Sequence, residues 1–263
     1  GWDVQATGRV QDLQLHFGEI PAPLKIRSGA FHTRGPVLRL EAWDLECLDG
    51  SSTLALTLET GGQGPQALEC DLSGGTLGPR ILAALQPGLP LPGGIELSAP
   101  MRIDQGSLHL VQGRITRVQA DLRAAESSLG LQFRMGPGRP ARYALHIADR
   151  WSKARIEIEQ QAEHLFATSF SGYLDPASLR NVFTTQTAFL GSALGHFSLR
   201  YRLDPFRIET ARGKISLSDL FLPMPGSTDK LGIEKLALKA DEQEIRIREA
   251  HLLFGSSTGT LTG

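Results

Sequence analysis

The residue types that most often do chemistry are scattered along this sequence. The seven histidines lie at positions 16, 32, 109, 146, 164, 196 and 251, never closer than 16 residues, and none stands near a cysteine at the spacing of a zinc site. Glu157 and Glu159 share one face of an expected strand and would offer paired carboxylates. The alternation of Arg155, Ile156 and Ile158 around them favours a solvated, structural face instead. We therefore predict no metal site and no catalytic residue.

Sequence motifs for nucleotide or acyl chemistry are missing as well. The sequence has no Gly-x-x-x-x-Gly-Lys, no Gly-x-Gly-x-x-Gly and no Gly-x-Ser-x-Gly. The formal net charge is -1 and aromatic residues make up 6%, which argues against a nucleic-acid binder with a basic, base-stacking surface. We therefore expect that the protein is not an enzyme, and that it binds neither a cofactor nor a nucleic acid. An enzyme whose site is assembled from scattered residues stays an alternative.

The two cysteines, Cys47 and Cys70, fall on expected strands that have a third strand between them. Next-nearest strands lie about 10 Å apart, beyond the reach of a disulfide. We expect two free thiols that face inward; a disulfide is the alternative in an oxidising compartment.

Alternation of apolar and polar residues dominates the chain and predicts strands with one apolar face. It is clear in Leu54, Leu56 and Leu58, and again in Phe197, Leu199 and Tyr201. Such alternation is typical of an antiparallel sheet that is covered on one side only, whereas parallel sheets under helices show continuous apolar runs. Two short helices are expected at 78–86 and 175–184, because Pro79 and Pro176 suit a first helical residue and Asp175 suits an N-cap.

Three pairs of similar short segments, which we call sequence echoes, suggest a repeat of about 100 residues. Gly78-Pro79 is echoed by Asp175-Pro176, Gly113-Arg114-Ile115-Thr116 by Gly213-Lys214-Ile215-Ser216, and Gly50-Ser51-Ser52-Thr53 by Gly255-Ser256-Ser257-Thr258. We predict a first β block over 1–94, a second over 95–194 and a truncated third over 195–263, all in one continuous β-groove. A single irregular β-domain is the alternative.

The predicted fold is all-β: a long, strongly curved antiparallel sheet built from diverged repeats, with two short helices. Two short helices are too few to cover the apolar face of such a sheet. The sheet must therefore close on itself or hold something apolar. The residues expected to line a lipid groove are Leu54, Leu56, Leu68, Leu72, Leu131, Phe133, Leu145, Ile147, Phe197, Leu199, Tyr201, Leu236, Leu238, Ile245 and Ile247. The alternative is that each is ordinary core of a closed β-sandwich that serves as a structural or interaction module.

Two stretches carry a family resemblance. They are Phe17 to Phe31, followed by Leu38 to Glu41 and Gly50 to Ser52, and then Arg212 to Ser257. Their cadence of a proline-flanked strand, a glycine-rich turn, a strand and Gly-Ser-Ser resembles the AsmA-like proteins of Gram-negative envelopes, in particular the YhdP-like branch.

The resemblance implies a repeating β-groove protein that is anchored in the inner membrane and carries phospholipid across the periplasm towards the outer membrane. The expected partners are a phospholipid or other acyl lipid, the inner membrane through a segment outside this chain, and envelope proteins. Because the chain starts at Gly1 and shows no leader, we expect it to be a periplasmic segment of a longer protein.

Overall fold

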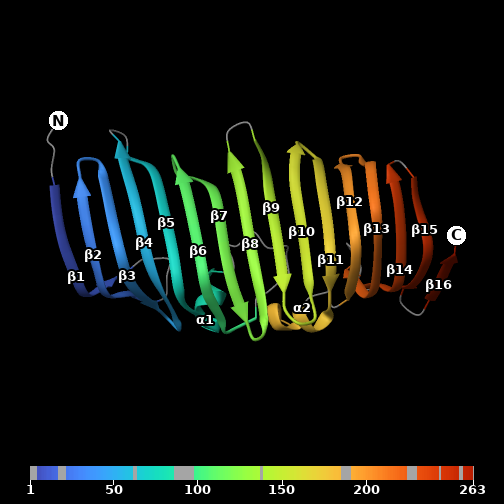
Figure 1. Ribbon diagram of the computed structural model, residues 1–263, viewed down its shortest axis with the longest axis horizontal. Helices are drawn as coiled ribbons and strands as arrows, with labels where there is room; N and C mark the ends of the chain where they lie inside the picture. The colour runs from blue at the N-terminus through green and yellow to red at the C-terminus, as the bar shows by residue number, and fades with distance from the viewer. Residues whose placement is uncertain are drawn as a thin grey trace. The chain divides into compact units, whose positions relative to one another are not determined.

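The fold is described from a computed structural model, and the structure describes residues 5–16, 22–61, 64–85, 98–136, 139–184, 191–223, 230–242, 244–254 and 257–262. Strands dominate these residues (Figure 1). The strands are β1 (Gln5–Leu15), β2 (Leu24–Arg34), β3 (Val37–Cys47), β4 (Gly50–Gly61), β5 (Gly64–Leu77), β6 (Met101–Val111), β7 (Arg114–Ala124), β8 (Ser127–Gly136), β9 (Arg139–Ala148), β10 (Lys153–Ala162), β11 (Leu165–Leu174), β12 (Ser192–Leu203), β13 (Phe206–Pro223), β14 (Lys230–Glu242), β15 (Glu244–Phe254) and β16 (Ser257–Thr262). The helices are α1 (Pro79–Leu85) and α2 (Pro176–Val182).

The sixteen strands form one antiparallel sheet whose order follows the chain from β1 to β16. The sheet is not closed. The strand content and the single antiparallel sheet confirm the predicted all-β class. A β-sandwich needs two packed sheets, and the described strands do not form them. Helix in the described residues is confined to α1 and α2, as expected; residue 86 of the first predicted helix lies outside the described residues.

Contacts divide the chain into two compact units. The first comprises Gly1–Leu91, Ser98–Ala124 and Gly130–Pro137, and the second comprises Pro92–Leu97, Ala125–Leu129 and Gly138–Gly263. The first unit thus holds β1–β7 with α1, and the second holds β9–β16 with α2. The expected division into three blocks stays a prediction, and its boundary at 94–95 lies outside the described residues.

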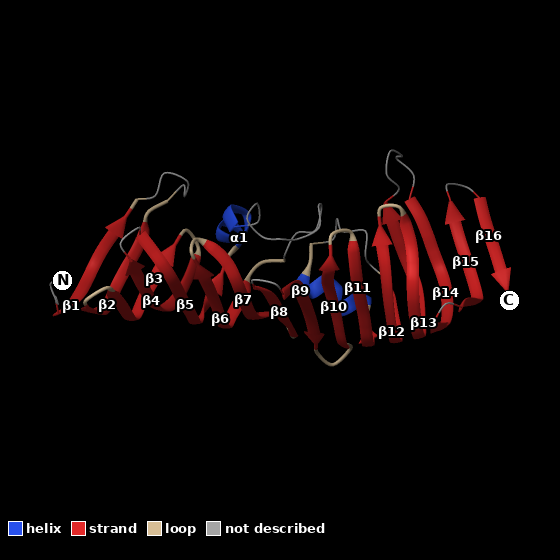
Figure 2. Cartoon of the chain, turned by 90° about the horizontal axis from the view of Figure 1, so that it is seen from above, coloured by secondary structure: helices blue, strands red, loops and turns tan. Residues whose placement is uncertain are grey.

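The second helix forms as its sequence predicts. Asp175 is the N-cap, and its side chain accepts a hydrogen bond of 2.8 Å from the amide of Ala177. Pro176 occupies the first helical position, where no amide hydrogen is needed. Leu179 and Val182 are buried, and Figure 2 shows α2 lying across β9, β10 and β11 of its unit. The helix therefore packs its apolar residues onto one end of these strands.

Both units use the same local arrangement of hairpin, two strands and helix. Asp49, in the turn between β3 and β4, accepts hydrogen bonds of 3.0 and 2.9 Å from the amides of Arg80 and Ile81 in α1. Asp149, in the turn between β9 and β10, accepts a hydrogen bond of 2.8 Å from the hydroxyl of Ser178 in α2. An aspartate on a hairpin turn thus holds the helix that follows two strands later, in agreement with the sequence echoes near one hundred residues.

Many of the buried side chains lie at the helix end of each unit, although Leu165 at the other end of β11 and Ala211 within β13 are buried as well. In the second unit, Leu174 ends β11 and faces Ala193, and both are buried. In the first, Leu77 ends β5 and faces Met101, which is completely buried. On the apolar face, Leu203 at the opposite end of β12 is 50% exposed, and Phe206, which begins β13 beside it, is 66% exposed. The helices thus cover only one end of the apolar face.

Candidate functional site

The strand register of the second unit places its apolar side chains in rows on one face. Leu145 faces Ile156, which faces Phe170, which in turn faces Phe197. In a neighbouring row, Leu199 faces Thr168. Such directly opposed side chains on one face contact each other. The rows therefore run across the strands as continuous apolar bands.

The remaining predicted groove residues of the second unit lie on this same face. Ile147 faces Ala154, Leu238 faces both Ile215 and Ile247, and Ile245 faces Ala240. Leu236 faces Leu217, and Tyr201 faces Phe166, with their ring centroids 5.9 Å apart. The prediction missed Ile156, Phe170, Ile215 and Leu217 as members of the rows, although the same alternation could have found them.

The first unit has an equivalent face. Its predicted residues Leu54 and Leu72 face each other, Leu56 faces Cys70, and Leu68 faces Leu58. The rows extend beyond the prediction: Phe31 faces Leu40, which faces Leu56, while Cys70 faces Leu108. Leu131 and Phe133 lie in β8, where they alternate with the exposed Gln132 and Arg134. All fifteen predicted residues are thus on strands at apolar positions of the alternation.

Most side chains of these rows are only partly buried. Leu54, Leu56, Phe197 and Leu199 are half-buried, and Ile247 is exposed. Ile147, near the helix end of β9, is almost completely buried, and so is the small Ala211 within β13. A well-packed core would bury such residues fully. The described part of the chain therefore leaves a broad strip of half-exposed apolar side chains.

The opposite face is polar and ion-paired. Glu157 lies between the guanidinium groups of Arg142 and Arg155, at 2.7 and 2.5 Å. The hydrogen bond from Arg142 is the main cause that holds the pKa of Glu157 below its ordinary value, against the effect of burial. The carboxylates at 157 and 159 thus belong to a solvated, ion-paired surface, as the sequence indicated.

A polar anchor, not found from the sequence, ties α2 to the strand ends. The Asp149 carboxylate accepts hydrogen bonds from the hydroxyls of Ser127 and Ser178 and from the amides of Trp151 and Ser152. Asn181 donates to the Ser127 hydroxyl at 3.0 Å. Burial raises the pKa of Asp149, but these four hydrogen bonds outweigh burial and lower it below the ordinary value. The carboxylate is therefore held ionised beneath the helix.

The two cysteines are free and half-buried, on β3 and β5 with β4 between them, as predicted. Cys70 belongs to the apolar rows, and burial, together with the charge of Asp71, raises the pKa of its thiol. Cys47 lies at the end of β3, with its Sγ 4.0 Å from the carbonyl oxygen of Ala22. One thiol thus lies within the apolar rows of the first unit, and the other lies at the end of β3.

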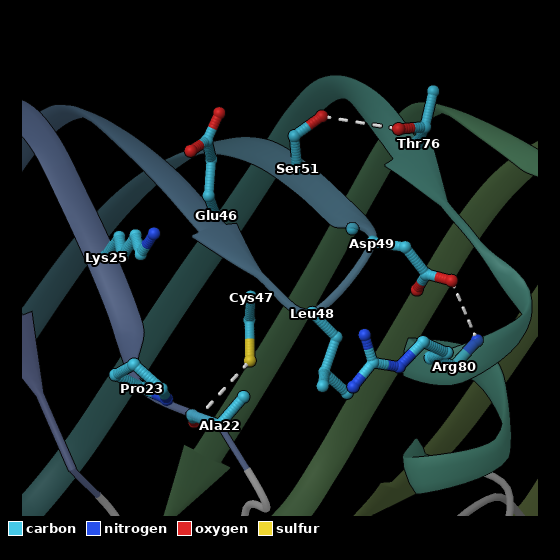
Figure 3. Close-up of a pocket in the computed structure, with 11 residues that line it drawn as sticks. Ala22, Pro23, Lys25, Glu46, Cys47, Leu48, Asp49, Ser51, Thr76 and Arg80 are labelled. Carbon is cyan, nitrogen blue, oxygen red and sulfur yellow. Dashed lines mark hydrogen bonds between the residues drawn. The ribbon is translucent and has the colours of Figure 1, made fainter.

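A pocket of about 520 Å³ surrounds Cys47. It is formed where β3 turns into β4 and where α1 begins, and residues of β2, β3, β4, β5 and α1 line it. Figure 3 shows Lys25 and Arg80 on opposite sides of Cys47, with Ser51 and Thr76 at one rim and Ala22 and Pro23 at the other. The lining is mainly polar, in contrast to the apolar rows.

Among the described residues, no three His, Cys, Asp or Glu side chains gather as metal ligands would. None of the described helices is long and apolar enough to cross a bilayer. Searches against protein-family models, curated proteins and solved structures find no match to this chain. The resemblance to AsmA-like proteins therefore stays a prediction.

Proposed function

We propose that the apolar face of the sheet holds the acyl chains of a phospholipid or another acyl lipid. The observation that carries the proposal is the continuity of the apolar rows, such as Leu145, Ile156, Phe170 and Phe197, on a face that the short helices cover only at one end. A large exposed apolar surface marks a binding site for an apolar ligand or partner.

The energetics of such binding need no catalytic group. Each methylene that leaves water for an apolar surface contributes about 0.8 kcal/mol, so two acyl chains outweigh the cost of immobilising the lipid. The rows supply half-buried Leu, Ile and Phe side chains for the chains, and the strand ends leave the head group access to water. The proposed role is to hold and pass on lipid, not to modify it.

We place this function in the periplasm of a Gram-negative bacterium, as part of an inner-membrane-anchored AsmA-like protein that moves phospholipid between the inner and outer membranes. The support for this setting is the resemblance at Phe17 to Phe31, Leu38 to Glu41, Gly50 to Ser52 and Arg212 to Ser257, together with the single antiparallel sheet. The stretch from Phe17 to Pro21 lies outside the described residues.

Native mass spectrometry of the purified chain tests the lipid proposal. We expect co-purified phospholipid on the wild-type chain and on Ser198→Asp, because Ser198 is exposed on the polar face. Leu199→Asp should lose most of it, because an unpaired carboxylate against hydrocarbon costs several kcal/mol. Equal lipid on both variants, or none on a folded wild-type chain supplied with lipid, would refute the proposal.

Docking of envelope proteins on the sheet is a second candidate. Within the described strands, β1 and β16 each have one side without a paired strand, and all six residues of β16 are exposed. An open strand edge can add an extended segment of a partner. A chain that binds no lipid but binds an envelope protein through β16 would favour this function.

A further inference from the structure

The pocket around Cys47 has a charge pattern that is not explained by the fold. It is lined by two cations, Lys25 and Arg80, and by two carboxylates, Glu46 and Asp49. Charged groups that line a concave pocket give it specificity for a complementary ligand. Which of the four charges are already bound decides the sign of that ligand.

Both carboxylates are occupied by the protein itself. Glu46 forms an ion pair with Arg27, with 2.5 Å between Oε1 of Glu46 and Nη2 of Arg27. Asp49 accepts the amide hydrogens of Arg80 and Ile81, and these bonds outweigh desolvation to hold its pKa below the ordinary value. Each carboxylate therefore already has a partner within the protein.

The cations are not bound in this way. Within the described ranges of the chain, neither the ammonium of Lys25 nor the guanidinium of Arg80 forms an ion pair. The amide of Arg80 donates to Asp49, but its guanidinium acts on Asp49 only through its charge. Figure 3 shows these side chains approaching Cys47 from opposite sides. The hydroxyls of Ser51 and Thr76 lie 3.3 Å apart. The pocket thus offers two cations and a hydroxyl pair.

We propose that this pocket binds a phosphate group, and that the phosphate is the head group of a lipid whose acyl chains lie on the apolar rows of the first unit. Phosphate oxygens accept charge-assisted hydrogen bonds from lysine and arginine, and arginine can bind two of them at once. The volume of about 520 Å³ is within the range of small-ligand sites.

The position of the pocket supports a lipid as the source of the phosphate. Cys47 stands on the same face of β3 as Leu45 and Trp43, and Trp43 faces Leu54 of the apolar rows. Cys47 therefore places one wall of the pocket at the end of those rows, whereas Lys25, Glu46, Ser51 and Thr76 face one another on the other side of the same strand ends, so the pocket spans the edge between the two faces. This inference rests on the proposed function, since the acyl chains are the part of the ligand that the rows would hold.

The two cysteines allow both claims to be tested in one experiment. Cys47 reports on the pocket and Cys70 on the apolar rows. The folded chain is treated with iodoacetamide, and peptide mass spectrometry measures how far each ligand slows alkylation at each thiol. The probes are dihexanoylphosphatidylglycerol, dihexanoylglycerol without phosphate, and inorganic phosphate.

We expect the phospholipid to slow alkylation at both cysteines and dihexanoylglycerol to slow it at Cys70 only. In Lys25→Ala/Arg80→Ala, the phospholipid concentration that protects Cys47 should rise about tenfold or more, as loss of charge-assisted bonds predicts. Lys214→Ala/Arg248→Ala removes two exposed cations elsewhere and should leave it unchanged. Circular dichroism confirms that each variant is folded.

Other outcomes separate the inference from the proposed function. Protection of Cys70 by both lipids, with Cys47 unprotected or equally protected by dihexanoylglycerol, overturns the phosphate site but leaves acyl binding in place. Protection of Cys47 by inorganic phosphate, with Cys70 unprotected by either lipid, overturns the lipid source and the proposed function together.

Discussion

At the scale of single residues, Asp149 shows how a polar group can hold a helix on an apolar sheet. Its carboxylate accepts four hydrogen bonds that come from the start of β8, from its own turn and from α2. Ser127 and Ser178 are fully buried, so their hydroxyls depend on this acceptor. A buried donor that loses its partner is costly.

We predict that Asp149→Asn lowers the free energy of unfolding by about 1–2 kcal/mol at pH 7. This is the lower part of the range for hydrogen bonds to charged groups, because solvent partly screens the half-buried carboxylate. The pKa of Asp149 is lower in the folded chain, so its stabilisation is present above the unfolded value of about 3.9 and is lost as pH falls through the folded value.

Urea unfolding of both proteins between pH 7 and pH 2 checks this prediction. The difference between wild type and Asp149→Asn should shrink towards pH 2, whereas the exposed Asp241→Asn should differ little from wild type at any pH. A difference that is the same at pH 7 and pH 2 would show that the carboxylate charge has no part in the anchor.

Cys70 makes a second prediction at this scale. Since burial raises its pKa, the thiolate fraction at pH 8 is smaller in the folded chain than in the unfolded chain. Alkylation of Cys70 should therefore be slower in the folded chain, and its rise with pH should be displaced upward. Non-reducing peptide mapping should recover Cys47 and Cys70 unlinked; a bond between them would contradict the strand order β3-β4-β5.

At the scale of elements, two glycines lie where a side chain would meet the backbone of the neighbouring strand. Gly172 of β11 has a φ of +108°, and a Cβ at that position would lie 1.9 Å from the carbonyl oxygen of Lys153. Gly75 of β5 has a φ of +126°, and a Cβ there would lie 2.0 Å from the carbonyl oxygen of Ser51. Both glycines lie near the end of the strand that leads into a helix, so they let the strand reach the helix end.

We predict that Gly172→Ala lowers the free energy of unfolding by at least about 2 kcal/mol, because alanine rarely adopts this φ and its methyl group meets backbone. Gly259→Ala is the matched control, since nothing lies within 4 Å of a Cβ there. Thermal and urea unfolding measure both. Similar stability of the two variants would mean that β10 and β11 can separate without cost.

The strands and helices were largely predictable from sequence, but the polar clusters were not. Alternation at Phe197, Leu199 and Tyr201 is a local signal that one face of a strand is apolar, and Pro176 after Asp175 is a local signal for a helix start. Asp149, Ser127 and Ser178 come together only because β8, the turn after β9 and α2 end at the same place. The spacing of these three residues in the sequence does not predict that they come together.

At the scale of the whole molecule, the strand order gives the apolar rows their continuity. Each described strand pairs with its neighbours in sequence, so a repeating alternation stays on one face from strand to strand within a unit. The charged side chains, such as Arg142 and Glu157, collect on the other face. The pocket at Cys47 escaped prediction because Lys25 and Arg80 are far apart in the sequence.

The central claim is that only one face of the sheet meets acyl chains, and photocrosslinking along β12 tests it most directly. A photoreactive residue is placed singly at positions 199, 200, 201 and 202, and each folded variant is illuminated with phospholipid vesicles. Lipid adducts should form at 199 and 201, where the side chains belong to the apolar rows, and not at 200 and 202, where Arg200 and Arg202 pair with Glu209. Adducts of equal yield at all four positions, or at none in folded protein, would contradict the account.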